Sequence, residues 1–162
     1  MRTKGFTLVE ILIVVVILGI LAAIVIPQFT DASTQARESS LASDLQTLRS
    51  QIELYKVQHK DKLPGTVSGV TFVQAITGLT DIDGNVAASG AKPGDVGVYG
   101  PYMKSIPYNP FNNKNTVEVV NDASAGVGDG GTKDGWWFNS KTGEIRANDA
   151  GSSPDGTKHT AL

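Results

Sequence analysis

The stretch Phe6–Phe29, FTLVEILIVVVILGILAAIVIPQF, decides the fold of the amino-terminal part of the chain. As far as Ile26 it is apolar, apart from Thr7, Glu10 and Gly19. At the rise of an α-helix the run spans about 30 Å, which matches the hydrocarbon core of a bilayer. The sequence therefore predicts a helix that can cross a membrane.

Glu10 conflicts with this apolar environment. An unpaired carboxylate in hydrocarbon costs about 2.5–3.5 kcal/mol even on lenient insertion scales. The helix dipole favours an acid in the first turn. Arg2 and Lys4 precede the segment, so the positive-inside rule predicts a cytoplasmic amino terminus and a single membrane pass. Glu10 therefore requires a partner that offsets its cost.

The rest of the chain is polar and rich in glycine, and it leaves a core too small for a large enzyme. The net charge of −2 is mild, so we expect no nucleic-acid partner. The absence of cysteine excludes disulfides and thiolate metal sites. Neither His59 nor His159 has an obvious nucleophile or second metal ligand near it in sequence. An enzyme is not expected.

A secretory signal peptide also has a basic start and an apolar middle. The apolar run here exceeds the roughly 7–15 residues of such a peptide. The nearest cleavage candidate, Thr30-Asp31-Ala32, lies beyond Pro27 and is a poor match. A secreted binding module would mature after Ala32, so the position of the mature amino terminus separates it from a retained helix.

The string Lys4-Gly5-Phe6-Thr7-Leu8-Val9-Glu10 resembles the prepilin-type processing site of type IV pilins and type II secretion pseudopilins. The apolar helix and the position of Pro27 are similar to that family as well. The resemblance implies that a prepilin peptidase cuts between Gly5 and Phe6 and methylates the new amino group of Phe6.

The resemblance also implies the partners and the location. They are a homopolymer filament, the peptidase and methyltransferase, an inner-membrane assembly platform and minor pseudopilins. The protein would insert into the bacterial inner membrane and then enter a periplasmic or cell-surface filament. Phe6 and Glu10 become the assembly residues, since cleavage creates an ammonium group at Phe6. Glu10 can meet that ammonium within its own helix or in a neighbouring subunit, or it can reach the membrane interface without a partner.

Beyond the apolar run, apolar residues recur at helical spacing. We expect Pro27 to break or kink the helix near Val25–Gln28, with Gly19 as a second weak point. Leu63-Pro64-Gly65 should end the helix. The apolar stripe is formed by Leu41, Leu45, Leu48, Ile52 and Tyr55. The predicted organisation is a leader (1–5), a transmembrane and filament-core helix (6–29), an amphipathic helix (30–62) and a globular domain (63–162).

The predicted fold class is α+β, with the long helix packed on a small carboxy-terminal antiparallel sheet, as the resemblance also implies. We expect a short helix within Val70–Leu79 with Thr71 as a possible N-cap. Strands are expected at Asn115–Val120, Gly135–Ser140 and Gly143–Asn148, the last two as a hairpin. Trp136 and Trp137 should alternate between the core and a partly exposed face. The tail from Gly151 should be flexible.

The absence of cysteine and the segments GPYMKSIPYNPFN and GWWFNSKTGEIR favour the major pseudopilin of a type II secretion system. A type IV pilus pilin, major or minor, shares every amino-terminal feature and is the alternative. Its roles would be adhesion, motility or DNA uptake.

Calcium is a further option, because the family's major pseudopilins commonly bind it in a carboxy-terminal loop. Asp81, Asp83, Asp129 and Asp134 are weak candidates in glycine-rich stretches. The spacing lacks the glycine and glutamate of an EF-hand. A solvated acidic turn is the interpretation that we favour, and no cofactor is required.

If Glu10 sets the register between subunits, its removal should reduce assembly but leave processing intact. We expect Glu10→Ala and Glu10→Gln both to lower filament yield, because neither side chain carries a charge for the ammonium group. Leader cleavage, checked by mass, should be unchanged in both variants. Normal assembly of both would exclude the register role.

Overall fold

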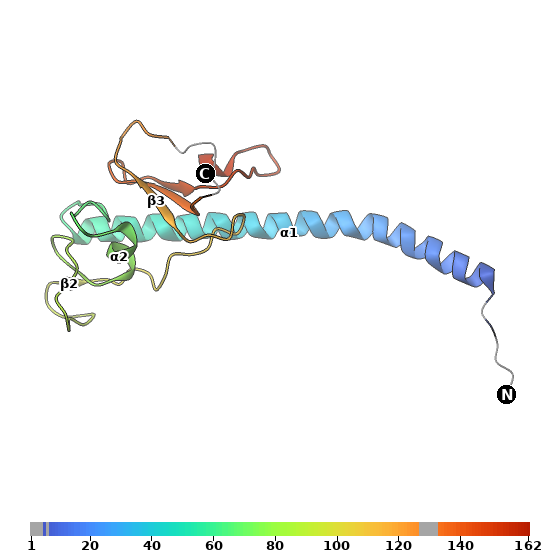
Figure 1. Cartoon of the computed structure of the whole chain (residues 1–162), viewed down its shortest axis with the longest axis horizontal. Coiled ribbons are helices and arrows are strands. Elements are labelled where there is room, and N and C mark those ends of the chain that lie inside the picture. Colours follow the sequence, from blue (N-terminus) through green and yellow to red (C-terminus); the bar gives the residue numbers. More distant parts are fainter. Residues whose placement is uncertain (1–4, 6, 127–132) are drawn as a thin grey trace. The chain divides into compact units, whose positions relative to one another are not determined.

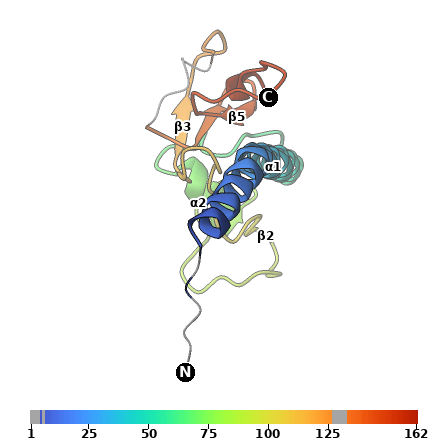
Figure 2. The same ribbon diagram turned by 90° about the vertical axis from the view of Figure 1, so that its right-hand side faces the viewer.

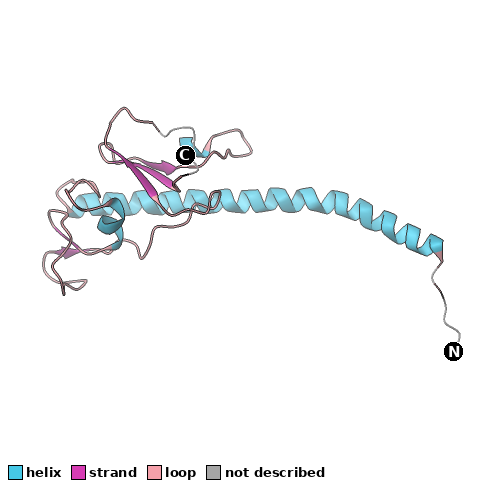
Figure 3. Cartoon of the chain, viewed as in Figure 1, coloured by secondary structure: helices cyan, strands magenta, loops and turns pink. Residues whose placement is uncertain are grey.

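The computed structural model describes residues 5, 7–126 and 133–162, and Figures 1 and 3 show their elements. The chain divides into two units, Met1–Arg37 and Glu38–Leu162. Figure 3 shows that loops connect short elements after the first helix. The elements are α1 (Leu8–Gln58), α2 (Phe72–Thr77), β1 (Thr80–Asp81), β2 (Val98–Tyr99), β3 (Val117–Val120), β4 (Trp136–Asn139), β5 (Ile145–Ala147) and the 3₁₀ helix η1 (His159–Ala161).

In the first unit, α1 stays helical through Pro27 and Gly19. A break of the helix at these residues is therefore wrong, whereas a kink at Pro27 stays a prediction. Proline removes a single N–H from the helical ladder, and the bonds on either side keep the backbone helical. Thr30 adds a bond close to the proline, because its Oγ1 donates to the carbonyl of Ile26 at 3.1 Å. Every residue from Leu8 to Phe29 is exposed.

In the second unit, the predicted apolar stripe of α1 forms one side of the core. Its members are 0–1% exposed: Leu41, Leu45, Leu48, Ile52 and Tyr55. Residues of α2, β4 and β5 complete the same cluster: Phe72, Ala75, Ile76, Trp136, Phe138, Ile145 and Ala147, together with Ile106 from a loop. The helix therefore packs on its own chain here, as the α+β fold class predicted.

Helix α1 ends at Gln58, before the predicted stop at Leu63-Pro64-Gly65. Lys60 and Asp61 adopt positive φ angles of 54° and 62°. The N–H of Asp61 bonds to the carbonyl of Lys56 at 3.0 Å and so closes the helix end. Left-handed backbone in residues other than glycine is uncommon, so the sequence pattern pointed to the later Pro-Gly pair instead.

Helix α2 confirms the predicted short helix and its cap. Thr71 accepts a bond from the N–H of Gln74, and the Gln74 side chain accepts one from the N–H of Thr71. This capping box satisfies two backbone donors that the first turn leaves without helical partners. Helix α2 then places Phe72 against Phe138, with ring centroids 4.6 Å apart.

The three predicted strands form one sheet in the order β3-β4-β5, but its first pair is parallel. The expectation of a wholly antiparallel sheet is therefore wrong for β3, while β4 and β5 pair antiparallel as expected. Parallel pairing needs a crossover connection of about a dozen residues or more, and residues 121–135 supply it. Figures 1 and 2 show β3 and the sheet on one side of this part of α1 and β2 on the other.

The hairpin between β4 and β5 confirms the predicted turn. Gly143 has a φ of 79°, and its N–H bonds to the carbonyl of Asn139 at 2.8 Å. A Cβ on Gly143 would also lie 2.9 Å from the Leu63 side chain. Glycine is thus required here both for the left-handed backbone and for the close approach.

Both tryptophans are buried, which corrects the expectation that one would be partly exposed. Trp136 lies in the main core, and its Nε1 donates to the carbonyl of Pro107 at 2.9 Å. Trp137 stands opposite Arg146 on the other face of the sheet. Arg146 also donates to the carbonyl of Thr160 at 3.1 Å, so the carboxy-terminal segment lies over this face.

The tail is packed rather than flexible, which corrects a second expectation. His159 is fully buried, and its Nδ1 lies 2.6 Å from Oδ1 of Asp149. The other carboxylate oxygen of Asp149 accepts from Asn109 Nδ2 at 2.7 Å. The ring of His159 also packs on Phe111 at 4.0 Å between centroids. A polar pair buried in this way holds the last segment against the sheet.

His59 closes the other end of the core. Its ring stacks on Tyr55 at 3.8 Å between centroids, and its Nε2 lies 2.9 Å from Oγ1 of Thr80. Burial is the main cause that lowers the pKa of His59 below 6.5. Burial likewise raises the pKa of Tyr55 to about 12, with the charge of Asp81 as a second cause.

The lowered pKa of His59 predicts a loss of stability in mild acid. Near and below pH 6.5 the unfolded chain binds a proton at this position more readily than the folded chain does. The free energy of unfolding should therefore fall as the pH decreases through 6.5 and be insensitive to His59 only well above 6.5. Thermal unfolding of the full chain in detergent measures this slope. His59→Gln, which cannot titrate, should show a smaller slope; an equal slope would contradict the prediction.

Candidate processing and assembly site

The site at the start of α1 is built around Thr7 and Glu10. Thr7 is the N-cap, and its carbonyl accepts the first helical bond from Ile11 at 3.3 Å. The N–H of Glu10 donates to Oγ1 of Thr7 at 3.2 Å. In return, Oε2 of Glu10 accepts from the Thr7 N–H at 2.8 Å and from the Thr7 hydroxyl at 2.7 Å.

This reciprocal pattern is a capping box, a Thr-x-x-Glu arrangement at the head of a helix. It gives the Glu10 carboxylate two donors within its own chain, which partly offsets the cost of the acid near hydrocarbon. The other oxygen, Oε1, makes no hydrogen bond to the described residues. That oxygen remains available for a cation.

Glu10 was expected to need a charged partner, and its neutral partner Thr7 was not predicted. The signal for Thr7 is present in the sequence, because the pattern Thr7-Leu8-Val9-Glu10 immediately precedes an apolar run. Thr7 carries no charge, so the expectation of a cation for Glu10 did not include it.

The predicted cleavage site lies next to this box. Gly5 is exposed, while Phe6 lies outside the described residues. An exposed glycine before the helix suits a protease, which binds its substrate in an extended conformation. The predicted roles of Gly5 and Phe6 in cleavage and methylation stay predictions.

The helix that follows is apolar enough, over at least 18 residues, to cross a membrane. None of that window is buried within the structure. Exposure of large apolar side chains on every face of a helix is unfavourable in water. The surface from Leu8 to Phe29 therefore requires lipid or other apolar helices around it.

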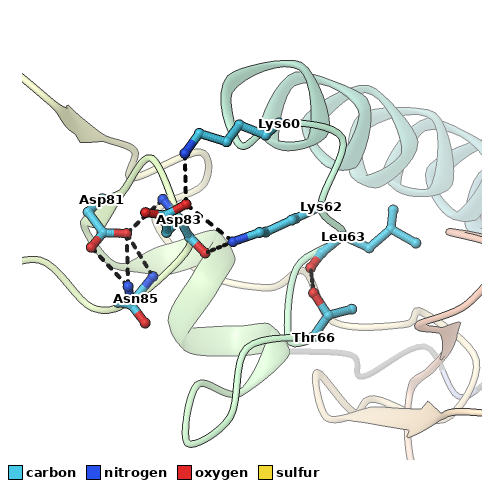
Figure 4. A network of polar contacts seen from close by, with 7 residues as sticks. All are labelled: Lys60, Lys62, Leu63, Thr66, Asp81, Asp83 and Asn85. Carbon is cyan, nitrogen blue, oxygen red and sulfur yellow. Dashed lines mark hydrogen bonds and ion pairs between the residues drawn. The ribbon is translucent and has the colours of Figure 1, made fainter.

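The three calcium candidates that the structure describes, Asp81, Asp83 and Asp134, do not converge on a cation site. Figure 4 shows that the ammonium groups of Lys60 and Lys62 both point at Asp83, with Nζ atoms 2.9 and 3.3 Å from its Oδ1. These lysines are the main cause that lowers the pKa of Asp83. Two ammonium groups on one carboxylate oxygen leave it poorly suited to calcium. The contacts instead attach the turn after β1 to the end of α1.

Asp81 is used by its own turn. Its Oδ1 accepts from the main-chain N–H groups of Asp83 and Asn85 at 2.8 and 3.0 Å (Figure 4). The Asn85 side chain also donates to it, and this bond is the largest cause that lowers the pKa of Asp81. Asp134 lies beside a separate hollow with Lys104, and Asp129 lies outside the described residues. Within the described part of the chain, no three His, Asp or Glu side chains gather in a metal-binding group.

Comparison with known proteins identifies the family of the chain. The family model described as the prokaryotic N-terminal methylation motif matches residues 1–26. The type II secretion system core protein G of Pseudomonas aeruginosa is 34% identical over 113 residues, which cover 69% of this chain and 70% of that protein. The chain belongs to the pilin and pseudopilin family. The match extends well beyond the amino-terminal motif into the second unit.

Two further relatives show both branches of this family. The type II secretion system core protein G of Dickeya chrysanthemi is 39% identical over 69 residues, which cover 43% of this chain and 44% of that protein. The type IV narrow pilus major component PilA5 of Thermus thermophilus is 45% identical over 60 residues, which cover 37% of this chain and 52% of that protein. The chain thus spans about half the length of these two relatives. No solved structure matches the chain.

The capping box predicts that Thr7 supports the start of α1 through its hydroxyl. Thr7→Val removes the cap and should destabilise the first turn by about 1 kcal/mol, whereas Thr7→Ser retains the oxygen. Hydrogen exchange of the amides of residues 8–11 in detergent micelles should be about fivefold faster in Thr7→Val. Equal exchange rates in the two variants would show that the hydroxyl bonds have no energetic role.

Proposed function

We propose that the chain is a structural subunit of a type II secretion pseudopilus. A prepilin peptidase would process it, and its amino-terminal helix would polymerise it into a filament that supports protein secretion. The observation that carries this proposal is the match to core protein G over 113 residues, because it includes the second unit as well as the methylation motif. The uncovered apolar surface of α1 supports polymerisation through that helix.

The apolar surface would serve first in the membrane and then in the filament. Lipid tails and the side chains of neighbouring helices are similarly apolar, so moving α1 from one to the other costs little by itself. Close packing and polar contacts must then favour the filament. Gly19 is exposed, and a Cβ added to it would have no neighbouring described atom within 4 Å. Another helix can therefore approach α1 closely at this residue.

Glu10 would supply the polar contact. We assign Oε2 to the Thr7 cap and Oε1 to the ammonium group of Phe6 in a neighbouring subunit. A carboxylate and an ammonium group that meet in an apolar bundle attract strongly, while either one alone is costly. Such a contact would favour a single axial register between helices. N-methylation keeps this charge, since a secondary amine remains protonated.

The orientation follows from the basic residues of the leader. Arg2 and Lys4 lie before the apolar segment, and positive residues favour the cytoplasmic side. We therefore place the amino terminus in the cytoplasm and the second unit outside the bacterial inner membrane. The filament would form there together with an assembly platform and minor pseudopilins.

A type IV pilin is the second candidate, and the 45% identity to the narrow pilus component of Thermus thermophilus supports it. Both candidates share the processing site and the filament. They differ in whether filaments extend from the cell surface and whether secretion depends on them. We propose no enzymatic activity: both buried histidines are used in packing contacts with Tyr55, Thr80, Asp149 and Phe111.

The mass of the mature protein tests the processing step. Co-expression with a prepilin peptidase should yield residues 6–162 carrying one added methyl group. Gly5→Val should block cleavage, because a branched side chain at this position hinders an extended peptide in the protease. Gly19→Val is the matched control and should be processed normally. A mature protein that begins after Ala32 would overturn the family's processing scheme for this chain.

Imaging and secretion assays separate the two candidates. If the filament is a pseudopilus, deletion of the gene should abolish secretion of the cargo. Wild-type cells should then carry no long surface filaments. Long filaments with intact secretion would instead support the type IV pilin.

A further inference from the structure

Strand β3 lies at the outside of its sheet, and main-chain groups on its outer edge have no partner among the described residues. The N–H of Trp136 bonds to the carbonyl of Thr116, and the N–H of Ser140 bonds to that of Val120. In a parallel ladder this register directs the N–H and C=O groups of Val117 and Val119 away from β4. These four groups make no hydrogen bond to the described residues.

Two hollows lie beside this edge, between β3 and α2. The larger has a volume of about 610 Å³, and the smaller one about 270 Å³. Thr71, Val73 and Val117 line both hollows, so together they form one groove, the β3 groove. Val73 and Val119 are 41% and 43% exposed, which leaves apolar surface next to the free main-chain groups.

The edge has none of the side chains that commonly block strand addition. Proteins protect such edges with lysine, proline or a covering segment. The sequence of β3 is Val-Glu-Val-Val, without lysine or proline. Its one charged residue, Glu118, accepts a bond from Asn148 Nδ2 at 2.9 Å within the protein. The charge of Glu118 is therefore engaged with its own chain rather than with the groove.

We propose that the β3 groove binds an extended peptide segment of a partner protein by strand addition. Alternating N–H and C=O groups along an edge are matched by an extended main chain, which presents the complementary groups at the same spacing. Lys104 and Asp134 line the larger hollow, and the side chain of neither bonds to the described residues. The segment that fits best has apolar alternate residues and carries one acidic and one basic side chain opposite these two charges.

A second copy of the chain fits the β3 groove less well than a different protein does. This comparison rests on the proposed function. Two β3 edges that pair with each other form a self-complementary contact, which closes into a dimer. A filament needs head-to-tail contacts that continue from subunit to subunit. The groove is therefore assigned to a different protein, on a surface that remains usable in a filament subunit.

The test uses the full chain in detergent micelles and a fluorescent synthetic peptide, acetyl-Lys-Thr-Val-Thr-Val-Thr-Glu-amide, whose lysine, valines and glutamate share one face of the strand. Val119→Pro removes an outward N–H that the fold does not use, a position where edge strands tolerate proline. Val119→Thr is the matched control, since it keeps both the N–H and the strand preference. Fluorescence anisotropy measures affinity, thermal unfolding checks the fold, and amide NMR shifts locate the peptide.

We expect saturable binding that shifts the amides of Val117 and Val119. Affinity should fall about tenfold in Val119→Pro and stay unchanged in Val119→Thr. Lys104→Glu should weaken binding about threefold, and a peptide whose glutamate is replaced by lysine should recover it.

The proposal is wrong if the wild-type chain does not bind the peptide, or if a folded Val119→Pro binds it equally well. If Val119→Pro does not fold, the Lys104→Glu exchange alone decides. In that case the proposal is overturned if the altered peptide fails to recover binding to Lys104→Glu. Dimers formed through β3 without peptide would assign the edge to a second copy instead. None of these outcomes depends on filament formation, so the proposed function is tested separately.

Discussion

The apolar surface of α1 from Leu8 to Phe29 is the constraint on which the rest depends. The chain covers none of it, and water is an unfavourable environment for so much exposed hydrocarbon. Lipid would satisfy this surface in a single subunit, and neighbouring helices would satisfy it in an assembly. The membrane-inserted precursor and the filament subunit that we propose therefore meet the same physical requirement. The similarity to pilins and to core protein G is consistent with both.

In the proposed filament, Glu10 would add direction to an otherwise non-directional surface. Apolar packing alone permits many axial offsets between helices, because one aliphatic side chain resembles the next. The capping box holds the carboxylate at the head of the helix, with one oxygen bonded to Thr7 and the other without a described partner. Thr7 thus reduces the cost of the acid before assembly, while the free oxygen retains the capacity to bind a cation afterwards.

The second unit achieves order in its long loops without disulfides. Its core is narrow, since one stripe of α1 faces a short helix and a three-stranded sheet. Polar contacts attach the loops to this core. Lys60 and Lys62 hold the turn at Asp83 on the exposed surface, and Asp149 holds His159 in the interior. The buried Asp149–His159 contact is expensive to disrupt singly, because it leaves a desolvated group without a partner, whereas the exposed pairs at Asp83 contribute little each.

The sequence by itself determined the elements whose signals are local. These are the apolar run, the stripe from Leu41 to Tyr55, the cap at Thr71 and the turn at Gly143, because periodicity and backbone preference act over a few residues. Only the tertiary structure decided the parallel pairing of β3 and the burial of Trp137 and His159. Each of these depends on groups far apart in the chain, and no local pattern encodes which distant partner will satisfy a strand edge or a buried imidazole.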